Sequence, residues 1–380
     1  MGLMVSACAN NLYVGASSDD TSALDSGALD SSTLTDGETS SISIDTETAA
    51  DTVATDDTAS DDTGSDKECN DESAVDENAF SSDQMLPVGI RPLNGFENTV
   101  VGDPYIMLGP DDYYYLTGTT APDVSKDYDG IELWRSRDLS TWEYLGFVWT
   151  FANDAEEGSW YSLHYPYPVG DETVYIRVPQ GAEIHYINGK WWIAFAVLGG
   201  GTGILKSTSD QPEGPYENAI TGEKGYIAQR HVNPSLFQDD DGTVYYIEDN
   251  AAIAPMREDL SGVTEPLSAM SISGSGNDGA SLFKAFGHYY LSLAKYYNDA
   301  EDSYVHVVEV ADDIYGPYGQ PHEVIYNQPG DLTFFRDKAC QWWMTLSIGA
   351  DDFHAGTPAI APVEFDTNHL IRLDSDRLPQ

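Results

Sequence analysis

Basic residues are scarce in this chain of 380 residues. There are 17 Lys and Arg against 64 Asp and Glu, which gives a formal net charge of −47 at pH 7. A field of that sign repels the phosphates of nucleic acids and anionic membrane surfaces. The composition therefore excludes a nucleic-acid partner and favours a neutral ligand such as a sugar. A saline habitat and plain solubility are the alternative explanations.

Cysteines and long apolar runs are also few. Two of the three cysteines, Cys8 and Cys69, lie near or inside an acidic arm far from Cys340, so no disulfide framework or Cys-rich metal site is predicted. No apolar stretch is long enough to span a bilayer. The letters VSAC, which end at Cys8, resemble the lipobox of bacterial lipoproteins, although the preceding apolar run is short for a signal peptide. We expect an extracellular or cell-surface protein whose only membrane link is a lipid on Cys8; an accidental match is the alternative.

The first part of the chain has almost no aromatic residues. Residues 1–80 contain only Tyr13 and Phe80, and their 19 acidic residues face the single basic residue Lys67. Such a segment cannot bury enough apolar surface to offset chain entropy. We therefore expect residues 1–85 to be a disordered acidic, Ser/Thr-rich arm with a truncated signal or lipobox. Residues 86–380 should form the folded domain.

The folded part consists of imperfect copies of one pattern. Each copy has a short β-rich segment, a turn with Gly, Asp or Asn, and a second segment that opens on two adjacent aromatic residues. The pairs are Tyr114 and Tyr115, Trp191 and Trp192, Tyr245 and Tyr246, Tyr289 and Tyr290, and Trp342 and Trp343. Such copies are typical of β-hairpins. Five copies without a helical period predict an all-β fold, a five-bladed β-propeller.

In a propeller, the first strand of each blade lines the central channel. The residues that open these strands therefore converge on one funnel. The acidic or amide residues at or beside the five openings are Asp103, Glu183, Asn233, Asp278 and Asp331. Several carboxylates around a water-filled funnel are typical of a sugar-binding site, whereas the alternative is a set of strand caps.

These segments resemble glycoside hydrolase family 43 over residues 95–365. The resemblance rests on the order of several phrases: GDPYIMLGPDDYYYLTGT, IELWRSRDLSTWEYLGFVW, AEIHYINGKWW, ILKSTSDQPEGPYE, NPSLFQDDDGTVYYI and GASLFKAFGHYYL. It implies a five-bladed propeller and an inverting enzyme that removes arabinofuranosyl or xylosyl units. It also implies an Asp base on the first blade, a second Asp that tunes and orients the acid, and a Glu acid.

When the roles of the family's residues are transferred to this sequence, the position of the base is held by Asp103. The tuning position holds Asn233, and the position of the acid holds Asp278. An Asp acid is shorter than Glu by one methylene, and Asn233 has lost the charge that keeps an acid protonated. Asp331, where the family often has His, could restore that charge. Asn233 is interpreted as a once-catalytic position, and a simple strand cap before Pro234 is the alternative.

Other residues are weaker candidates. Glu183 is predicted to bind substrate, and Glu183 or Glu248 could replace Asp278 as a longer acid. Trp160, in a long insertion of blade 1, is predicted to stack on sugar rings, with core packing as the alternative. Asp331 is predicted to bind substrate. The histidines show no metal spacing. No cofactor is required, and calcium in the central channel is left open.

The leading hypothesis is therefore an exo-acting, inverting glycosidase with a carbohydrate substrate. A second hypothesis is a carbohydrate-binding propeller whose hydrolytic residues have decayed. A third is a hydrolase of marine galactans, as in the related family 117. The sugar, the linkage and the oligomeric state do not follow from the sequence.

Overall fold

A computed structural model describes the folded part of the chain. The described residues are 69, 91–96, 99–222, 224–229, 231–273, 277–296, 304–319, 321–326, 330–349, 355–366, 368 and 370–372. The predictions for Cys8 and for a disordered arm over residues 1–85 lie outside this set, apart from Cys69. Across the described residues, no helix is long and apolar enough to cross a membrane.

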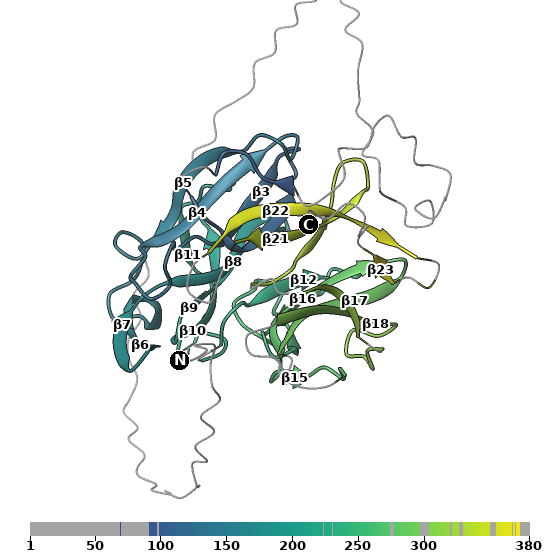
Figure 1. Cartoon of the computed structure of the whole chain (residues 1–380). Coiled ribbons are helices and arrows are strands. Elements are labelled where there is room, and N and C mark those ends of the chain that lie inside the picture. Colours follow the sequence, from purple (N-terminus) through teal and green to yellow (C-terminus); the bar gives the residue numbers. More distant parts are fainter. Residues whose placement is uncertain are drawn as a thin grey trace, which may run out of the picture. The chain divides into compact units, whose positions relative to one another are not determined.

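Five antiparallel sheets form five blades, as the repeats predicted (Figure 1). Blade 1 contains β2 (Gly102–Leu108), β3 (Tyr114–Thr119), β4 (Gly130–Ser136) and β5 (Glu143–Thr150). Blade 2 contains β8 (Pro179–Ile187), β9 (Lys190–Val197), β10 (Gly201–Ser207) and β11 (Tyr216–Asn218). Blade 3 contains β12 (Ser235–Gln238), β13 (Val244–Ile247), β14 (Ala252–Pro255) and β15 (Ser268–Ala269).

The last two blades complete the ring. Blade 4 contains β16 (Asn277–Ala285), β17 (His288–Tyr296), β18 (Tyr304–Ala311) and β19 (His322–Tyr326). Blade 5 contains β20 (Phe334–Arg336), β21 (Trp342–Ile348), β22 (Thr357–Phe365), β1 (Arg91–Pro92) and the short β23 (Ile371–Arg372), which pairs with β22. The earliest strand thus completes the last sheet, which joins the two ends of the ring.

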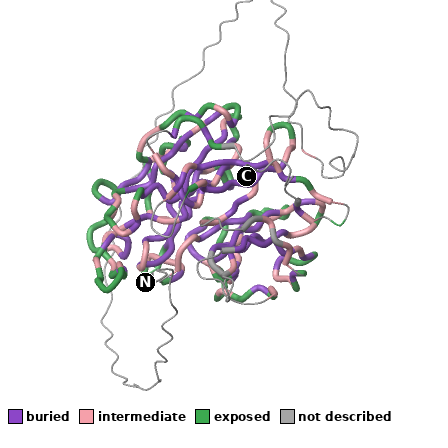
Figure 2. Tube along the Cα trace, viewed as in Figure 1, coloured by how far each residue is buried: buried purple, intermediate pink, exposed green. Residues whose placement is uncertain are grey.

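The paired aromatic residues explain how the blades hold together. Adjacent residues of a strand point to opposite faces of the sheet, and both faces of a blade are covered by neighbouring blades. Tyr115 packs with Trp191 of blade 2, and its neighbour Tyr114 packs with Phe335 of blade 5. The other four pairs are divided between two apolar clusters in the same way. Figure 2 shows the result, with buried residues along the strands and exposed residues mostly at outer turns.

A disulfide adds a second closure. Cys69 is bonded to Cys340, in the turn before β21, across 271 residues of sequence. Arg336 also donates a hydrogen bond to the carbonyl oxygen of Cys69 at 3.3 Å. Sequence reasoning did not predict this bond, because wide spacing in sequence says nothing about proximity across a closed ring. Cys69 therefore belongs with the propeller, although it precedes the predicted boundary at residue 86.

The long insertion between blades 1 and 2 is more than a loop. It contains a single 3₁₀ turn at Trp160–Ser162 and a hairpin of β6 (Tyr165–Val169) and β7 (Glu172–Ile176). Tyr167 and Ile176 of this hairpin pack on Ala121 and Val124, which follow the end of β3. The insertion therefore lies at the end of blade 1 where Thr119 meets Asp103.

Candidate active site

The openings of the five innermost strands share one backbone conformation. The residues with positive φ are Asp103 (47°), Gly181 (52°), Asn233 (48°), Gly279 (66°) and Gly330 (88°). Three are glycines, which adopt this conformation at little cost, whereas Asp and Asn pay some strain. Strained residues of this kind cluster at functional sites. Only Asp103 and Asn233 therefore project a side chain from this shared position.

The carboxylate of Asp103 is held at both oxygens. Oδ2 accepts a 2.6 Å hydrogen bond from the hydroxyl of Thr119, and Oδ1 accepts a 3.0 Å bond from the backbone N–H of Asp331. Thr119 also accepts a 2.9 Å bond from the N–H of Gly181, which leaves its own proton directed at Asp103. Blades 1, 2 and 5 together thus fix the orientation of Asp103, the predicted base.

Electrostatics suit Asp103 to accept a proton. Burial raises the pKa of Asp103 above its ordinary value, and the hydrogen bonds from Thr119 and Asp331 offset part of that rise. Asp103 as a whole residue is intermediate in exposure. A carboxylate with a raised pKa is a stronger base, provided that the pH keeps it ionised.

Asp331 links the base to blade 4. Its N–H contacts Asp103, while its carboxylate lies directly over the backbone of Gly279. A Cβ atom added to Gly279 would stand 1.5 Å from Oδ1 of Asp331, so glycine is required there. Gly279 follows Asp278, the predicted acid. The structure therefore places the carboxyl group of Asp331 beside the backbone that carries Asp278.

Asp278 itself lies in β16 opposite Ala294, beside a bulge that ends at Ala280. Its side chain falls outside the described residues, so its role as the acid stays a prediction.

Asn233 is packed tightly but its oxygen has no donor. Oδ1 is buried and lacks a hydrogen-bond partner within the described part of the chain. A Cβ atom on Gly181 would approach this oxygen to 2.6 Å, which shows how closely blade 2 covers it. Buried polar atoms are normally paired. The amide oxygen of Asn233 is therefore a buried acceptor whose hydrogen-bonding capacity is unused among the described residues.

Glu183 lies two residues beyond the opening of blade 2. Its Oε2 accepts a 3.1 Å hydrogen bond from Nε2 of His185, and Nδ1 of His185 accepts a 3.1 Å bond from the hydroxyl of Tyr105. The N–H of Leu236 also reaches Oε2 at 3.4 Å. Burial, together with the charge of Glu183, raises the pKa of Tyr105 well above its usual range. Glu183 therefore joins three blades, and its roles as a substrate ligand or an alternative acid stay predictions.

Trp160 lies in the core instead of on a binding face. Its indole is 8% exposed, stacks on Phe195 at 5.8 Å and donates a 2.7 Å hydrogen bond to the carbonyl oxygen of Gly225. Its predicted stacking on sugar is thus replaced by packing between blades.

The signal that sequence reasoning missed is Thr119, which the hairpin register places opposite Gly102 and therefore beside Asp103.

Glu248 differs from Glu183 because it lacks strong partners. It follows β13, is 3% exposed, and its Oε1 has no hydrogen-bond partner among the described residues. Burial raises the pKa of Glu248 to about 7; the nearby His231 lowers it and Asp249 raises it. These three residues form the single close group of potential metal ligands found in the described part of the chain. Sequence reasoning missed this group, and calcium in the central channel stays a prediction.

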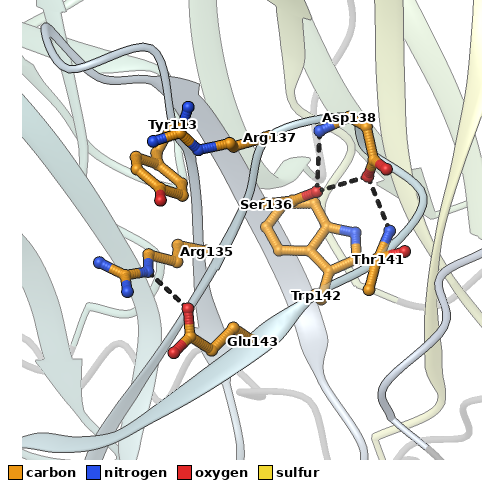
Figure 3. Close-up of a pocket in the computed structure, with 8 residues that line it drawn as sticks. All are labelled: Tyr113, Arg135, Ser136, Arg137, Asp138, Thr141, Trp142 and Glu143. Atoms are coloured by element: carbon orange, nitrogen blue, oxygen red, sulfur yellow. Dashed lines mark hydrogen bonds and ion pairs between the residues drawn. The ribbon is translucent and has the colours of Figure 1, made fainter.

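An open surface pocket in the described structure lies elsewhere. It has a volume of about 250 Å³ and lies at the β4–β5 turn of blade 1, where Arg135 and Arg137 flank the ring of Tyr113 (Figure 3). Trp142 and Glu143 also line it. It contains none of the residues that the sequence analysis singled out, so it is not the funnel that Asp103 faces.

Comparisons with known proteins identify a family for this chain. The profile of a family described as "Glycosyl hydrolases family 43" matches residues 93–371. A xylan 1,3-beta-xylosidase of Vibrio sp is 30% identical over 152 residues, which are 38% of this chain and 24% of that protein. A putative beta-xylosidase of Escherichia coli (strain K12) is 25% identical over 247 residues, which are 57% of this chain and 39% of that protein. The chain thus spans well under half the length of these curated relatives.

Solved structures share the fold. A GH43_1 enzyme from Xanthomonas citri complexed with xylose has a TM-score of 0.58 and 17% identity, covering 77% of this chain and 96% of that one. An endo-arabinase from Bacteroides thetaiotaomicron has a TM-score of 0.53 and 16% identity, covering 74% and 99%. The match of the family profile over residues 93–371 shows that this chain belongs to glycosyl hydrolases family 43, and the five blades agree with it.

Proposed function

We propose that the protein is an inverting, exo-acting glycosidase that removes xylosyl or arabinofuranosyl units, with Asp103 as the base. The observation that carries this proposal is the environment of Asp103 at the opening of blade 1. Its backbone has a positive φ, both carboxylate oxygens accept hydrogen bonds, and burial raises its pKa. The curated relatives named as xylosidases support the choice of sugar.

In the proposed reaction, Asp103 removes a proton from a water molecule that attacks the anomeric carbon. The glycosidic C–O bond breaks as the new C–O bond forms, and a protonated carboxyl gives its proton to the leaving oxygen. Asp278 is the proposed donor, with Asn233 as a hydrogen-bond acceptor that orients it. Asp331 replaces the charge that Asn233 lacks, because a neighbouring negative charge favours the protonated form of an acid. No organic cofactor is needed for these steps.

The location is a separate proposal. A disulfide such as Cys69–Cys340 persists in oxidising compartments, which supports an extracellular or cell-surface protein. Lipid attachment at Cys8 remains part of this proposal, and its test is mass spectrometry of the protein from its native host.

A decayed sugar-binding propeller is the second candidate, favoured by Asn233 at the tuning position. The test is a panel of aryl β-xylosides, aryl α-L-arabinofuranosides, xylo- and arabino-oligosaccharides and agaro-oligosaccharides, with Asp103→Asn as the blank. We expect release of a single pentose from one of the first four groups. Cleavage of the galactan only would shift the substrate class. Binding by calorimetry without any cleavage would establish the binding module instead.

A further inference from the structure

We infer that His231, Glu248 and Asp249 form a binding site for a divalent transition-metal ion of the Zn²⁺ type. The three residues come from two segments of blade 3. His231 precedes β12, and the two carboxylates follow β13, which pairs with β12 from Ser235 opposite Ile247. Nδ1 of His231 stands 2.9 Å from Oδ1 of Asp249 and 3.6 Å from Oε2 of Glu248.

The group is nearly close enough to bind a metal as it stands. One ligand atom from each residue lies within 4.8 Å of the others. Tetrahedral Zn²⁺ with bonds of about 2.0–2.2 Å needs ligand atoms roughly 3.3–3.6 Å apart. The 3.6 Å distance between His231 and Glu248 already lies in this range, and the 2.9 Å distance between His231 and Asp249 needs to widen by a few tenths of an ångström.

The backbone already holds the two carboxylates in place. The N–H of Glu248 donates to the carbonyl oxygen of Ala252 at 2.8 Å, and the N–H of Ala251 donates back to Glu248 at 2.9 Å. Oδ1 of Asp249 accepts a 2.8 Å bond from the N–H of Asn250. The acidic side chains therefore project from a closed turn, which lowers the entropy lost on binding an ion.

Glu248 supplies the independent reason for a ligand. It is buried to 3% exposure beside Tyr246, yet Oε1 has no hydrogen-bond partner within the described residues and Oε2 reaches only His231. Burying a carboxylate without hydrogen bonds is costly. A divalent cation would bind this unpaired carboxylate oxygen. It would also neutralise Glu248 and Asp249, which both lie beside the single imidazole of His231.

The donor set selects the kind of ion. One imidazole nitrogen with two carboxylates suits Zn²⁺ and, more weakly, Mn²⁺, whereas Ca²⁺ prefers six to eight oxygen ligands. Three protein ligands leave a fourth position for water. The ion would tie the segment leading into Asn233 to the turn after β13, and it is independent of whether Asp103 is catalytic.

The test is calorimetric titration of the chelator-treated full chain with Zn²⁺, Mn²⁺ and Ca²⁺, with thermal melting alongside. The variants are Glu248→Gln and His231→Gln. The control is His288→Gln, because His288 forms a similar 2.7 Å pair with Asp312 on the exposed side of blade 4. Co²⁺ absorption reports whether the bound ion has imidazole and carboxylate ligands.

We expect one Zn²⁺ per chain and a higher melting temperature on binding. Both site variants should weaken binding by at least about 100-fold, since even outer-shell changes cost 10–100-fold, and His288→Gln should leave it unchanged. Circular dichroism checks that each variant folds, and Asp249→Asn replaces any variant that does not. The inference is overturned if the wild type binds no stoichiometric Zn²⁺, if both site variants keep its affinity, or if Ca²⁺ binds more tightly than Zn²⁺.

Discussion

Asp103 opens blade 1 and Asn233 opens blade 3, with φ angles of 47° and 48° and a proline after each. The two residues differ in their surroundings. Both oxygens of Asp103 accept hydrogen bonds, whereas Oδ1 of Asn233 is buried without a donor among the described residues. The propeller thus repeats the same backbone conformation at both openings. The two side chains differ because Thr119 and Asp331 donate hydrogen bonds to Asp103, while no described residue donates one to Oδ1 of Asn233.

The largest expected effect comes from making the two openings alike. Asp103→Asn keeps the shape and the bond from the N–H of Asp331 but removes the base. General base catalysis is worth about 10²–10⁴-fold, so we expect kcat to fall by about 10³-fold. Sugar affinity and melting temperature should stay near wild type. The measurement is steady-state hydrolysis with calorimetry as a binding control, and unchanged kcat would remove Asp103 from the mechanism.

A smaller effect is expected from Asp331→Asn. The backbone N–H still holds Asp103, but the charge over Gly279 is lost. Without that charge the acid ionises more readily, so the alkaline limb of the pH–rate profile should move to lower pH. Activity at neutral pH should fall roughly tenfold, the effect of about 1.4 kcal/mol. Asp312→Asn, at an exposed position, is the charge control; a profile identical to wild type would show that Asp331 does not act on the acid.

Asn233→Asp makes the opening of blade 3 resemble that of blade 1, because it adds a carboxylate there. The added charge should keep the acid protonated to higher pH, so the alkaline limb should move up and neutral activity should rise a few-fold. Asn233→Ala is the matched control, because it opens the site without adding charge. A fall in activity of Asn233→Asp would show instead that the amide is a working adaptation.

The smallest effect on activity is expected from Thr119→Val. Its hydroxyl lowers the pKa of Asp103, so its loss should raise that pKa and move the acid limb of the profile to higher pH. Neutral activity should change little. The N–H of Gly181 loses its acceptor, which should cost about 1–3 kcal/mol of stability. Thr119→Ser keeps the hydroxyl and should behave like wild type; an unmoved acid limb in Thr119→Val would show that this hydroxyl does not tune the base.

Much of the fold followed from the sequence because its signal is local. A turn and two adjacent aromatic residues specify a hairpin, and Tyr114 and Tyr115 show that the pair is needed because both faces of each blade are buried. The disulfide and the insertion hairpin were not predicted. Cys69 and Cys340 are 271 residues apart, so only ring closure brings them together.

The site was harder to predict because side-chain roles depend on contacts between blades. Asp103 was proposed as the base from its motif, but Thr119 and Asp331 lie elsewhere in the chain and were not predicted as its hydrogen-bond partners. Glu183 looked equivalent in sequence, but in blade 2 the opening position is Gly181, and Glu183 lies two residues further on, in a buried network with His185. Such contacts between blades cannot be predicted from composition.

In the proposed mechanism, Asp103 activates a water molecule that attacks the sugar directly. ¹H NMR of the first sugar released by the wild type, recorded before mutarotation, tests this step. We expect the anomer opposite to that of the substrate, since a single displacement inverts the centre. Release of the same anomer as the substrate would require a covalent glycosyl-enzyme intermediate and would contradict the role of Asp103 as a base.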